Sequence, residues 1–416
     1  MKLLRLGLIL LCAVVWARAA DDEDEKKGGQ PPTEIPDFSN LDEYIYQPKS
    51  TLNFGVRYIS GVKTKFWGTG QINSPEALPD PTTANIDRTY HDGRVSPDAR
   101  AATTDNGDGT SGTSPIPSDG KTNYWTYDSP SQLTTSGFMQ FHLYSGQSLD
   151  TSVRSQTGRG SLGLEMSVVR DMGTFGKHLS WKLFGGMSMN DIQSATMGNV
   201  RASITTVTDT YDLFGQTPPA APYSSTSTGT TTTQTGTDVN GNAVSQTVDT
   251  TTLLGNAPLN RTTTTAVDTT TLIEHWKLHG SYLTFRGGPM LVYDVSDRLH
   301  LSVSAGVALL YAGSFYEVNE VLNVPTGGQI IDTLSNTSNH LLPGYYADAT
   351  VQYDLTERTG FYMGAFMQNA GSYTQTASAS GNSAYGDLSG QGNGSFKTNV
   401  DFSNQQGLRT GVTFRF

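Results

Sequence analysis

The chain of 416 residues has a single cysteine, few charged residues and no long apolar run beyond its first twenty residues. Asp, Glu, Lys and Arg make up only 16% of the chain, below the quarter that is usual for globular domains. The absence of further apolar runs excludes helical membrane spans, which need about 20 consecutive apolar residues each. A net charge of −11 without a basic cluster in the sequence argues against nucleic acid as a partner.

The start of the chain has the pattern of a secretory signal peptide. Two basic residues precede an apolar stretch over residues 6–16, and a small-x-small cleavage pattern ends at Ala19. Cys12 lies inside this segment, so cleavage leaves a mature chain without cysteine and excludes disulfides, thiolate metal sites and cysteine nucleophiles. We expect residues 1–19 to be the signal peptide and residues 20–49 to be a flexible periplasmic tail.

Beyond residue 50 the sequence alternates between apolar and small or polar residues, which predicts β-strands. The longest example runs from Leu299 to Tyr311, with an apolar residue at every odd position. We recognise eight such segments, and they are joined alternately by short and by long connections. The short connections are 171–177, 294–298 and 354–358, and the long ones are 61–158, 191–279, 317–343 and 374–404. Tight turns at one end and long loops at the other are typical of outer-membrane β-barrels.

These patterns predict an all-β fold, an antiparallel transmembrane β-barrel over residues 50–416. We expect eight strands, with short periplasmic turns and long extracellular loops. Ten strands are the alternative, because residues 122–127 and 137–144 also alternate. A soluble β-sandwich is the competing fold. It would carry many charges opposite the apolar face, whereas this sequence has small residues there, such as Ser302 and Gly306.

The final strand ends on Phe414 and Phe416, and it resembles the C-terminal signal that the barrel-insertion machinery reads in Gram-negative outer-membrane proteins. Residues 288–299 (GPMLVYDVSDRL) resemble a strand–turn–strand unit of the small outer-membrane barrels: the OmpA transmembrane domain, opacity proteins and the OmpW type. The resemblance implies the outer membrane of a Gram-negative cell, with outer-membrane lipid and lipopolysaccharide as surroundings. It implies a loose function in adhesion, envelope integrity or passage of small solutes. The first two long connections exceed what this family needs.

Charged residues at positions that we expect to face the lumen decide whether the barrel is open. These residues are Arg57, Glu165, Lys182, Arg286, Asp348 and Arg409. They lie at similar distances from the short turns, so we expect one layer near mid-membrane. An unpaired buried carboxylate is costly, so we expect Glu165 to pair with Arg57 or Lys182, and Asp348 with Arg409 or Arg286. Such a network fills a narrow lumen and predicts a plugged structural barrel. The alternative is a narrow channel for anions or small polar solutes.

The functional prediction is therefore a structural, surface-exposed barrel that contributes to envelope integrity and to surface contact through its long loops. The Thr-rich stretch 224–271 favours a second alternative, an adhesin that contacts polysaccharide or another cell surface. Asn106-Gly107-Asp108-Gly109 resembles the middle of a calcium loop but lacks the carboxylates at its ends. The seven histidines show no metal-binding or catalytic spacing. We predict no catalytic residues, no cofactor, no metal and no enzyme activity.

Overall fold

The computed structural model describes residues 49–73, 78–105, 111–115, 118–151, 153–225, 231–237, 243–249, 252–325, 328–378 and 393–416. The predicted signal peptide, the predicted tail up to residue 48 and the Asn106–Gly109 segment lie outside these residues. The described part is mostly β-strand and includes a short 3-10 helix, η2 (Pro130–Gln132). No helix in these residues has the length and hydropathy needed to cross a membrane.

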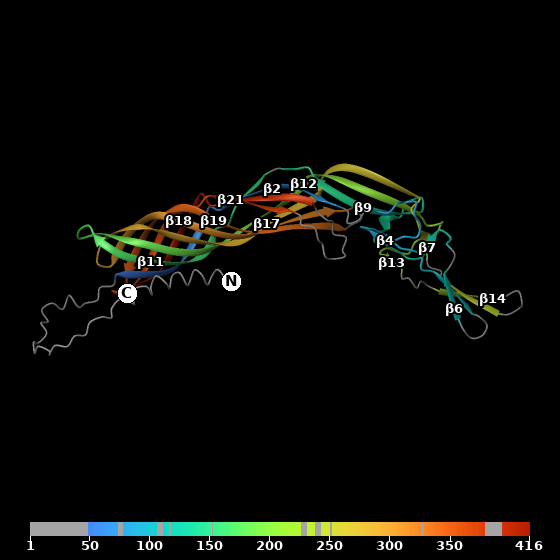
Figure 1. Ribbon diagram of the computed structural model, residues 1–416, viewed down its shortest axis with the longest axis horizontal. Helices are drawn as coiled ribbons and strands as arrows, with labels where there is room; N and C mark the ends of the chain where they lie inside the picture. The colour runs from blue at the N-terminus through green and yellow to red at the C-terminus, as the bar shows by residue number, and fades with distance from the viewer. Residues whose placement is uncertain are drawn as a thin grey trace, which may run out of the picture. The chain divides into compact units, whose positions relative to one another are not determined.

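The main element of the fold is a closed ring of antiparallel strands, of which Figure 1 shows β18 and β19 side by side. In order around the ring the strands are β1 (Ser50–Ser60), β11 (Ser161–Thr174), β12 (Leu179–Asp212), β17 (Asn260–Asp294), β18 (Leu299–Asn323), β19 (Gln329–Asp354), β20 (Thr359–Asn369) and β23 (Gln405–Arg415). The ring closes because β1 pairs both with β11 and with β23, while β11 pairs also with β12. Closure leaves no open sheet edge around the ring, as a β-structure must in lipid.

The same sheet continues beyond the ring. It gains β2 (Lys63–Ile72), β9 (Phe138–Ser148), β10 (Arg154–Thr157), β21 (Ser372–Ser378) and β22 (Asn393–Asp401), and thus contains thirteen strands. The prediction of an eight-stranded or ten-stranded barrel whose remaining residues form loops is therefore wrong. β12 and β17 are 34 and 35 residues long, whereas a tilted strand crosses a bilayer in about 9–11 residues. Much of each predicted long loop is strand.

The described residues also form three smaller sheets. One contains β3 (Arg88–Tyr90), β4 (Gly93–Val95), β8 (Trp125–Tyr127) and β13 (Tyr223–Ser224). A second contains β5 (Ala101–Asp105), β6 (Ser111–Pro115), β14 (Thr231–Thr237) and β15 (Ala243–Asp249), and a third pairs β7 (Lys121–Thr122) with β16 (Leu254–Gly255). In the Thr-rich stretch, β14 and β15 pair in antiparallel register. The second predicted extra strand, β9, joins the main sheet, whereas the first, β8, does not.

The phase of the apolar alternation reverses along each long strand. Near the short turns, outward residues of β18 such as Val303 and Val307 are exposed and apolar, and inward residues such as Ser304 are polar. Farther along β18 the inward residues are apolar and buried, as at Tyr316 and Val318. The outward residues of the neighbouring strand β17 become polar there, as at His275, Lys277 and His279.

This reversal explains why the long loops were predicted wrongly. The backbone hydrogen bonds between the strands continue past the membrane. The outward apolar side chains, which identify a strand in contact with lipid, end at the membrane surface. Beyond that surface the sheet encloses an apolar core, as a soluble β-protein does. We call the two ends of the ring the short-turn end and the long-strand end. Exposed outward apolar residues such as Val303 and Val307 surround the closed ring, and we call them the apolar belt. This belt identifies a membrane-spanning β-barrel, the architecture of outer-membrane proteins.

Candidate functional site

Five of the six predicted lumen residues meet in one buried layer inside the ring. They come from five strands: Arg57 from β1, Glu165 from β11, Arg286 from β17, Asp348 from β19 and Arg409 from β23. Each of the five side chains is at most 5% exposed. Each strand contributes an inward position because alternate residues of a strand point to opposite faces.

The layer is held together by ion pairs that share their carboxylates. Glu165 accepts from Arg286 Nη2 at 2.7 Å and from Arg409 Nη1 at 2.9 Å. Arg409 Nη2 lies 2.8 Å from Asp348 Oδ1 and 2.6 Å from Thr350 Oγ1. Glu165 is thus bound by two guanidinium groups rather than by Arg57 or Lys182, while Asp348 does contact Arg409. Sharing each carboxylate offsets the cost of removing these charges from water.

Arg57 belongs to the layer without a direct carboxylate contact. Its Nη1 donates to Ser188 Oγ, and its guanidinium lies 4.1 Å from the centroid of the Phe366 ring. Arg57 Nε and Nη2 have no hydrogen-bond partner among the described residues, and neither do Arg286 Nε and Arg409 Nε. The layer therefore has three cations for two anions, with several unused N–H donors.

Lys182 lies outside this layer, which corrects its predicted place. Its Nζ pairs with Asp171 Oδ1 at 2.6 Å, and the two residues are opposite each other on β12 and β11. Ser188, six positions farther along β12, is the residue opposite Glu165. Counting residues from the expected turn misplaced Lys182, because β11 continues to Thr174 through residues that were expected in the turn and Lys182 is therefore opposite Asp171.

A cavity of about 370 Å³ lies between the charged layer and the short-turn end. Lys182, Arg409, Arg415 and His300 are among its lining residues. His300 bridges two carboxylates, with Nδ1 2.6 Å from Asp294 and Nε2 2.9 Å from Asp354. Most of the residues that line the cavity are polar or charged, and the cavity reaches Arg409 of the charged layer.

On the other side of the layer the interior is filled by side chains. Ile59, Tyr282, Leu310 and Phe402 are buried there, and they belong to one apolar cluster that continues toward the long-strand end. Gln405 crosses this region and donates to Tyr282 Oη at 3.1 Å. The interior thus changes from a polar cavity through an ion-paired layer to an apolar core.

The long-strand end has its own aromatic core. Trp125 packs against Tyr223 with ring centroids 4.9 Å apart, and Tyr90 packs against Phe141 at 5.2 Å. These rings belong to a second buried cluster, separate from the one above the charged layer. Tyr90 donates to the fully buried Asp209 at 2.6 Å. This end of the protein is a packed structure rather than a set of loops.

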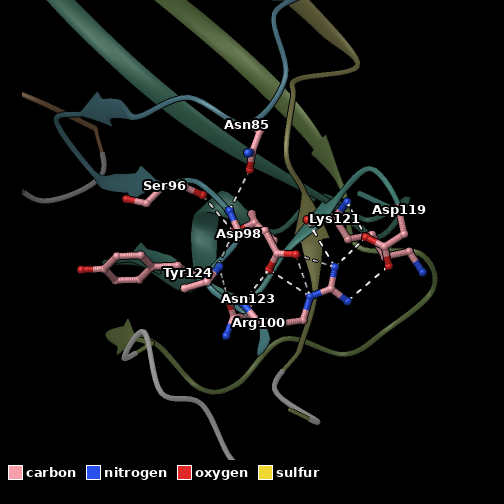
Figure 2. A network of polar contacts seen from close by, with 10 residues as sticks. Asn85, Ser96, Asp98, Arg100, Asp119, Lys121, Asn123 and Tyr124 are labelled. Atoms are coloured by element: carbon pink, nitrogen blue, oxygen red, sulfur yellow. Dashed lines mark hydrogen bonds and ion pairs between the residues drawn. The ribbon is translucent and has the colours of Figure 1, made fainter. Parts of the chain in front are cut away.

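Polar contacts tie the connections of this region together (Figure 2). Figure 2 shows Arg100 between two carboxylates, with Nη2 2.9 Å from Asp98 Oδ2 and 2.6 Å from Asp119 Oδ1. The hydrogen bonds from Arg100 lower the pKa of Asp119. Asn85 Oδ1 accepts from the Asp98 N–H at 2.9 Å, which links a third segment to the same network. These contacts hold together the segment that connects β4 and β8.

The described residues contain no metal-binding cluster. No group of three His, Cys, Asp or Glu side chains within them is placed to hold a metal ion. The Asp92–His142 pair, at 2.6 Å, is largely buried, and Asp92 also accepts from the His142 backbone N–H at 2.7 Å. This pair therefore ties one segment to β9.

The two residues of the predicted insertion signal lie at the short-turn end. Phe414 on β23 is opposite Leu52 of β1 and is exposed on the belt. Phe416 follows the strand, and its N–H donates to the Ser50 carbonyl at 3.0 Å. Their role in insertion stays a prediction.

No family model and no curated protein matches the chain. The structure is matched to the crystal structure of a Pseudomonas aeruginosa FadL homologue, with 10% sequence identity, 88% of this chain and 90% of that chain covered, and a TM-score of 0.17. So low a TM-score means that the two backbones do not superpose closely.

The predicted resemblance to the small OmpA, opacity and OmpW barrels is withdrawn. The sheet has thirteen strands, and no family model matches the chain. The short strand–turn–strand unit at residues 288–299 does not distinguish one outer-membrane barrel family from another.

Proposed function

We propose that this protein is a plugged outer-membrane β-barrel that acts at the cell surface through the folded β-structure of its long-strand end. The observation that carries the proposal is the filled lumen, in which the layer around Glu165 and Arg409 is followed by an apolar core. A lumen occupied by side chains favours an anchor over a pore. The packed aromatic core around Trp125 supports a role for the long-strand end as a defined contact surface.

Contact with polysaccharide or with another cell surface is the finer part of the proposal. The surface there is rich in Thr with few charges, as along the paired stretches of β12 and β17 at residues 203–210 and 260–267. Such side chains offer hydroxyl groups for hydrogen bonding to sugars. The barrel would hold this surface outside the cell.

Orientation can be tested by cysteine labelling, because a chain cleaved after Ala19 has no cysteine of its own. Val267→Cys at the long-strand end and Asp297→Cys in a short turn place a thiol at exposed positions. On intact cells, a membrane-impermeant maleimide should label Val267→Cys and spare Asp297→Cys. Labelling of Asp297→Cys alone would reverse the proposed orientation and remove the basis for surface contact.

A narrow channel is the second candidate, favoured by one observation. The polar cavity reaches Arg409, and the adjoining layer has unused guanidinium N–H groups that could bind water or an anion. Single-channel recording of the refolded protein separates the candidates. A plugged barrel gives a silent bilayer, whereas a steady conductance that Arg286→Ala abolishes or enlarges would establish the channel.

A further inference from the structure

Four cationic side chains lie on the outward face of the sheet, on the long-strand side of the apolar belt. They are Lys63 and Lys65 on β2, Lys397 on β22, and Arg159, which precedes β11. All four are exposed. The residues that alternate with the lysines on β2, Thr64 and Phe66, are buried. The face that carries the cations is therefore the outer face of the sheet.

Strand register brings the four residues into one patch. Lys63 and Lys65 are two positions apart on one strand, and Lys397 is opposite Trp67 in the next row. Diagonal neighbours of this kind have Cα atoms about 7–8 Å apart. The Gly158 N–H donates to the Val62 carbonyl at 2.8 Å, which places Arg159 beside the start of β2.

The four patch cations form no salt bridge with a carboxylate of the described residues. The salt bridges of the described residues join Arg94, Arg100, Lys182, Arg261, Arg286, Arg409 and Arg415 to carboxylates, and the four patch residues take part in none of them. Asp401 is opposite Lys63, but it forms no salt bridge there, and its Oδ1 accepts from the Ser403 N–H. The patch keeps a net positive charge in a chain whose net charge is −11.

The height of the patch relative to the membrane follows from the register of β1. Tyr58 is opposite Leu162 on one side and Leu408 on the other, and this row is the last apolar one on these strands. Arg159 and Lys63 lie three and five residues beyond that row. At about 3.3 Å per residue and a tilt near 40°, they are roughly 8–13 Å past it. The long side chains of Arg159 and Lys63 reach the headgroup layer from this height, and Lys65 and Lys397 follow farther along the strands.

We propose that this patch binds the phosphate groups of lipid headgroups in the membrane leaflet at the long-strand end. Lysine offers phosphate a compact charge and arginine a planar pair of N–H donors. The patch touches the belt, so a lipid whose acyl chains cover Tyr58 and Leu162 brings its headgroup to these side chains. The proposal rests on the proposed membrane anchoring, but it does not require the lumen to be closed.

The test is native mass spectrometry of the full-length refolded protein in detergent, titrated with diphosphorylated lipid A and with lipid A lacking phosphate. We expect the wild-type protein to bind the diphosphorylated form at least about tenfold more tightly. Lys63→Gln/Lys65→Gln/Lys397→Gln should lose this preference, and Arg159→Gln should reduce it. Lys277→Gln is the matched control, because Lys277 is also exposed on the outer face but has Glu317 opposite it. It should keep the preference.

Equal binding of both lipids by the wild-type protein would overturn the proposal, and so would an unchanged preference in the triple variant. Retention of the heat-dependent gel shift verifies that a variant is folded. If the triple variant does not fold, the single variant Lys65→Gln is titrated with the same two lipids instead. A conducting wild-type barrel would end the proposal of a plugged anchor while leaving this lipid preference intact, so the two failures are distinguishable.

Discussion

Glu274 on β17 and Glu320 on β18 lie directly opposite each other inside the long-strand end, 1% and 0% exposed. Asp332 on β19 continues the row next to Glu320. Among the described residues, both carboxylate oxygens of Glu320 and one of Glu274 have no hydrogen-bond partner. Burial raises the pKa of Glu274 to about 8 and that of Glu320 to about 9, and the mutual proximity of the carboxyls adds to the second shift. A contact with Ser148 and the charge of Arg154 oppose the shift at Glu274, whereas Asp150 adds to it.

We predict that Glu320→Gln stabilises the protein at pH 8 and leaves its stability unchanged at pH 4. Unfolded carboxyls titrate near pH 4.3, so between about pH 5 and 9 the folded state holds more protons than the unfolded state. Stability therefore falls as pH rises through this window. The cost is about 1.4 kcal/mol per pH unit for each raised carboxyl, and glutamine avoids it. Urea unfolding followed by tryptophan fluorescence at the two pH values measures the difference.

Glu317→Gln is the control for this measurement, because Glu317 is on the outward face of the same strand, opposite Lys277. It should show no gain that grows with pH. If Glu320→Gln has the same effect at pH 4 and pH 8, the two opposed carboxyls are not protonated in the folded state.

The sequence was sufficient for the part of the fold that faces lipid and insufficient for the rest. Outward residues such as Val303 and inward residues such as Arg286 could be assigned from alternation, because lipid on one side and a narrow lumen on the other restrict both faces. Beyond the membrane the alternation continues in the opposite phase, as at Trp276 and Leu278. That phase reversal was readable in the sequence, yet it was interpreted as the end of each strand. Glu274 was therefore assigned to a loop.

Side-chain pairing inside the lumen was beyond the reach of the sequence. Alternation places Glu165 and Arg409 on the inner face, but it does not say which strands are neighbours across the lumen. Arg286 meets Glu165 although β17 and β11 do not pair directly. The partner of a lumen residue depends on closure of the ring and on strand tilt, which no local pattern encodes.

Glu165→Gln should destabilise the barrel strongly. The substitution removes the negative charge that Arg286 and Arg409 share, and it leaves three guanidinium groups with Asp348 as the remaining carboxylate of the layer. Removing one partner of a buried ion pair costs roughly 3–5 kcal/mol. The midpoint of urea unfolding in detergent, or the temperature of the gel-mobility shift, reports this loss.

Lys182→Gln is the comparison for the lumen variant. Its ion pair with Asp171 is partly exposed, and such pairs contribute only about 0–1 kcal/mol. Equal effects of the two substitutions would mean that the central layer is hydrated and contributes little to stability.

Trp125→Ala should unfold the long-strand end while the ring stays closed. Trp125 is 1% exposed and contacts both Tyr127 and Tyr223, and replacing such a core residue by alanine costs about 3–5 kcal/mol. Limited proteolysis should then cut within residues 78–133 while the protected ring retains its heat-dependent gel mobility. Loss of the gel shift together with rapid proteolysis would mean that the two cores fold as one unit.

A pair of matched valines tests where the membrane ends. Val303 on β18 and Val267 on β17 are 55% and 57% exposed, and both are in strands of the same sheet. Val303 is in the apolar belt, whereas Val267 is beyond the phase reversal among threonines. An arginine on the lipid face near the bilayer midplane costs about 2–4 kcal/mol. Val303→Arg should therefore lower the free energy of unfolding in lipid vesicles by that amount. Val267→Arg contacts water and should change it by less than about 0.5 kcal/mol. Equal losses of unfolding free energy would mean that both valines contact the same medium. The phase reversal near Gly280 on β17 would then not mark the membrane surface.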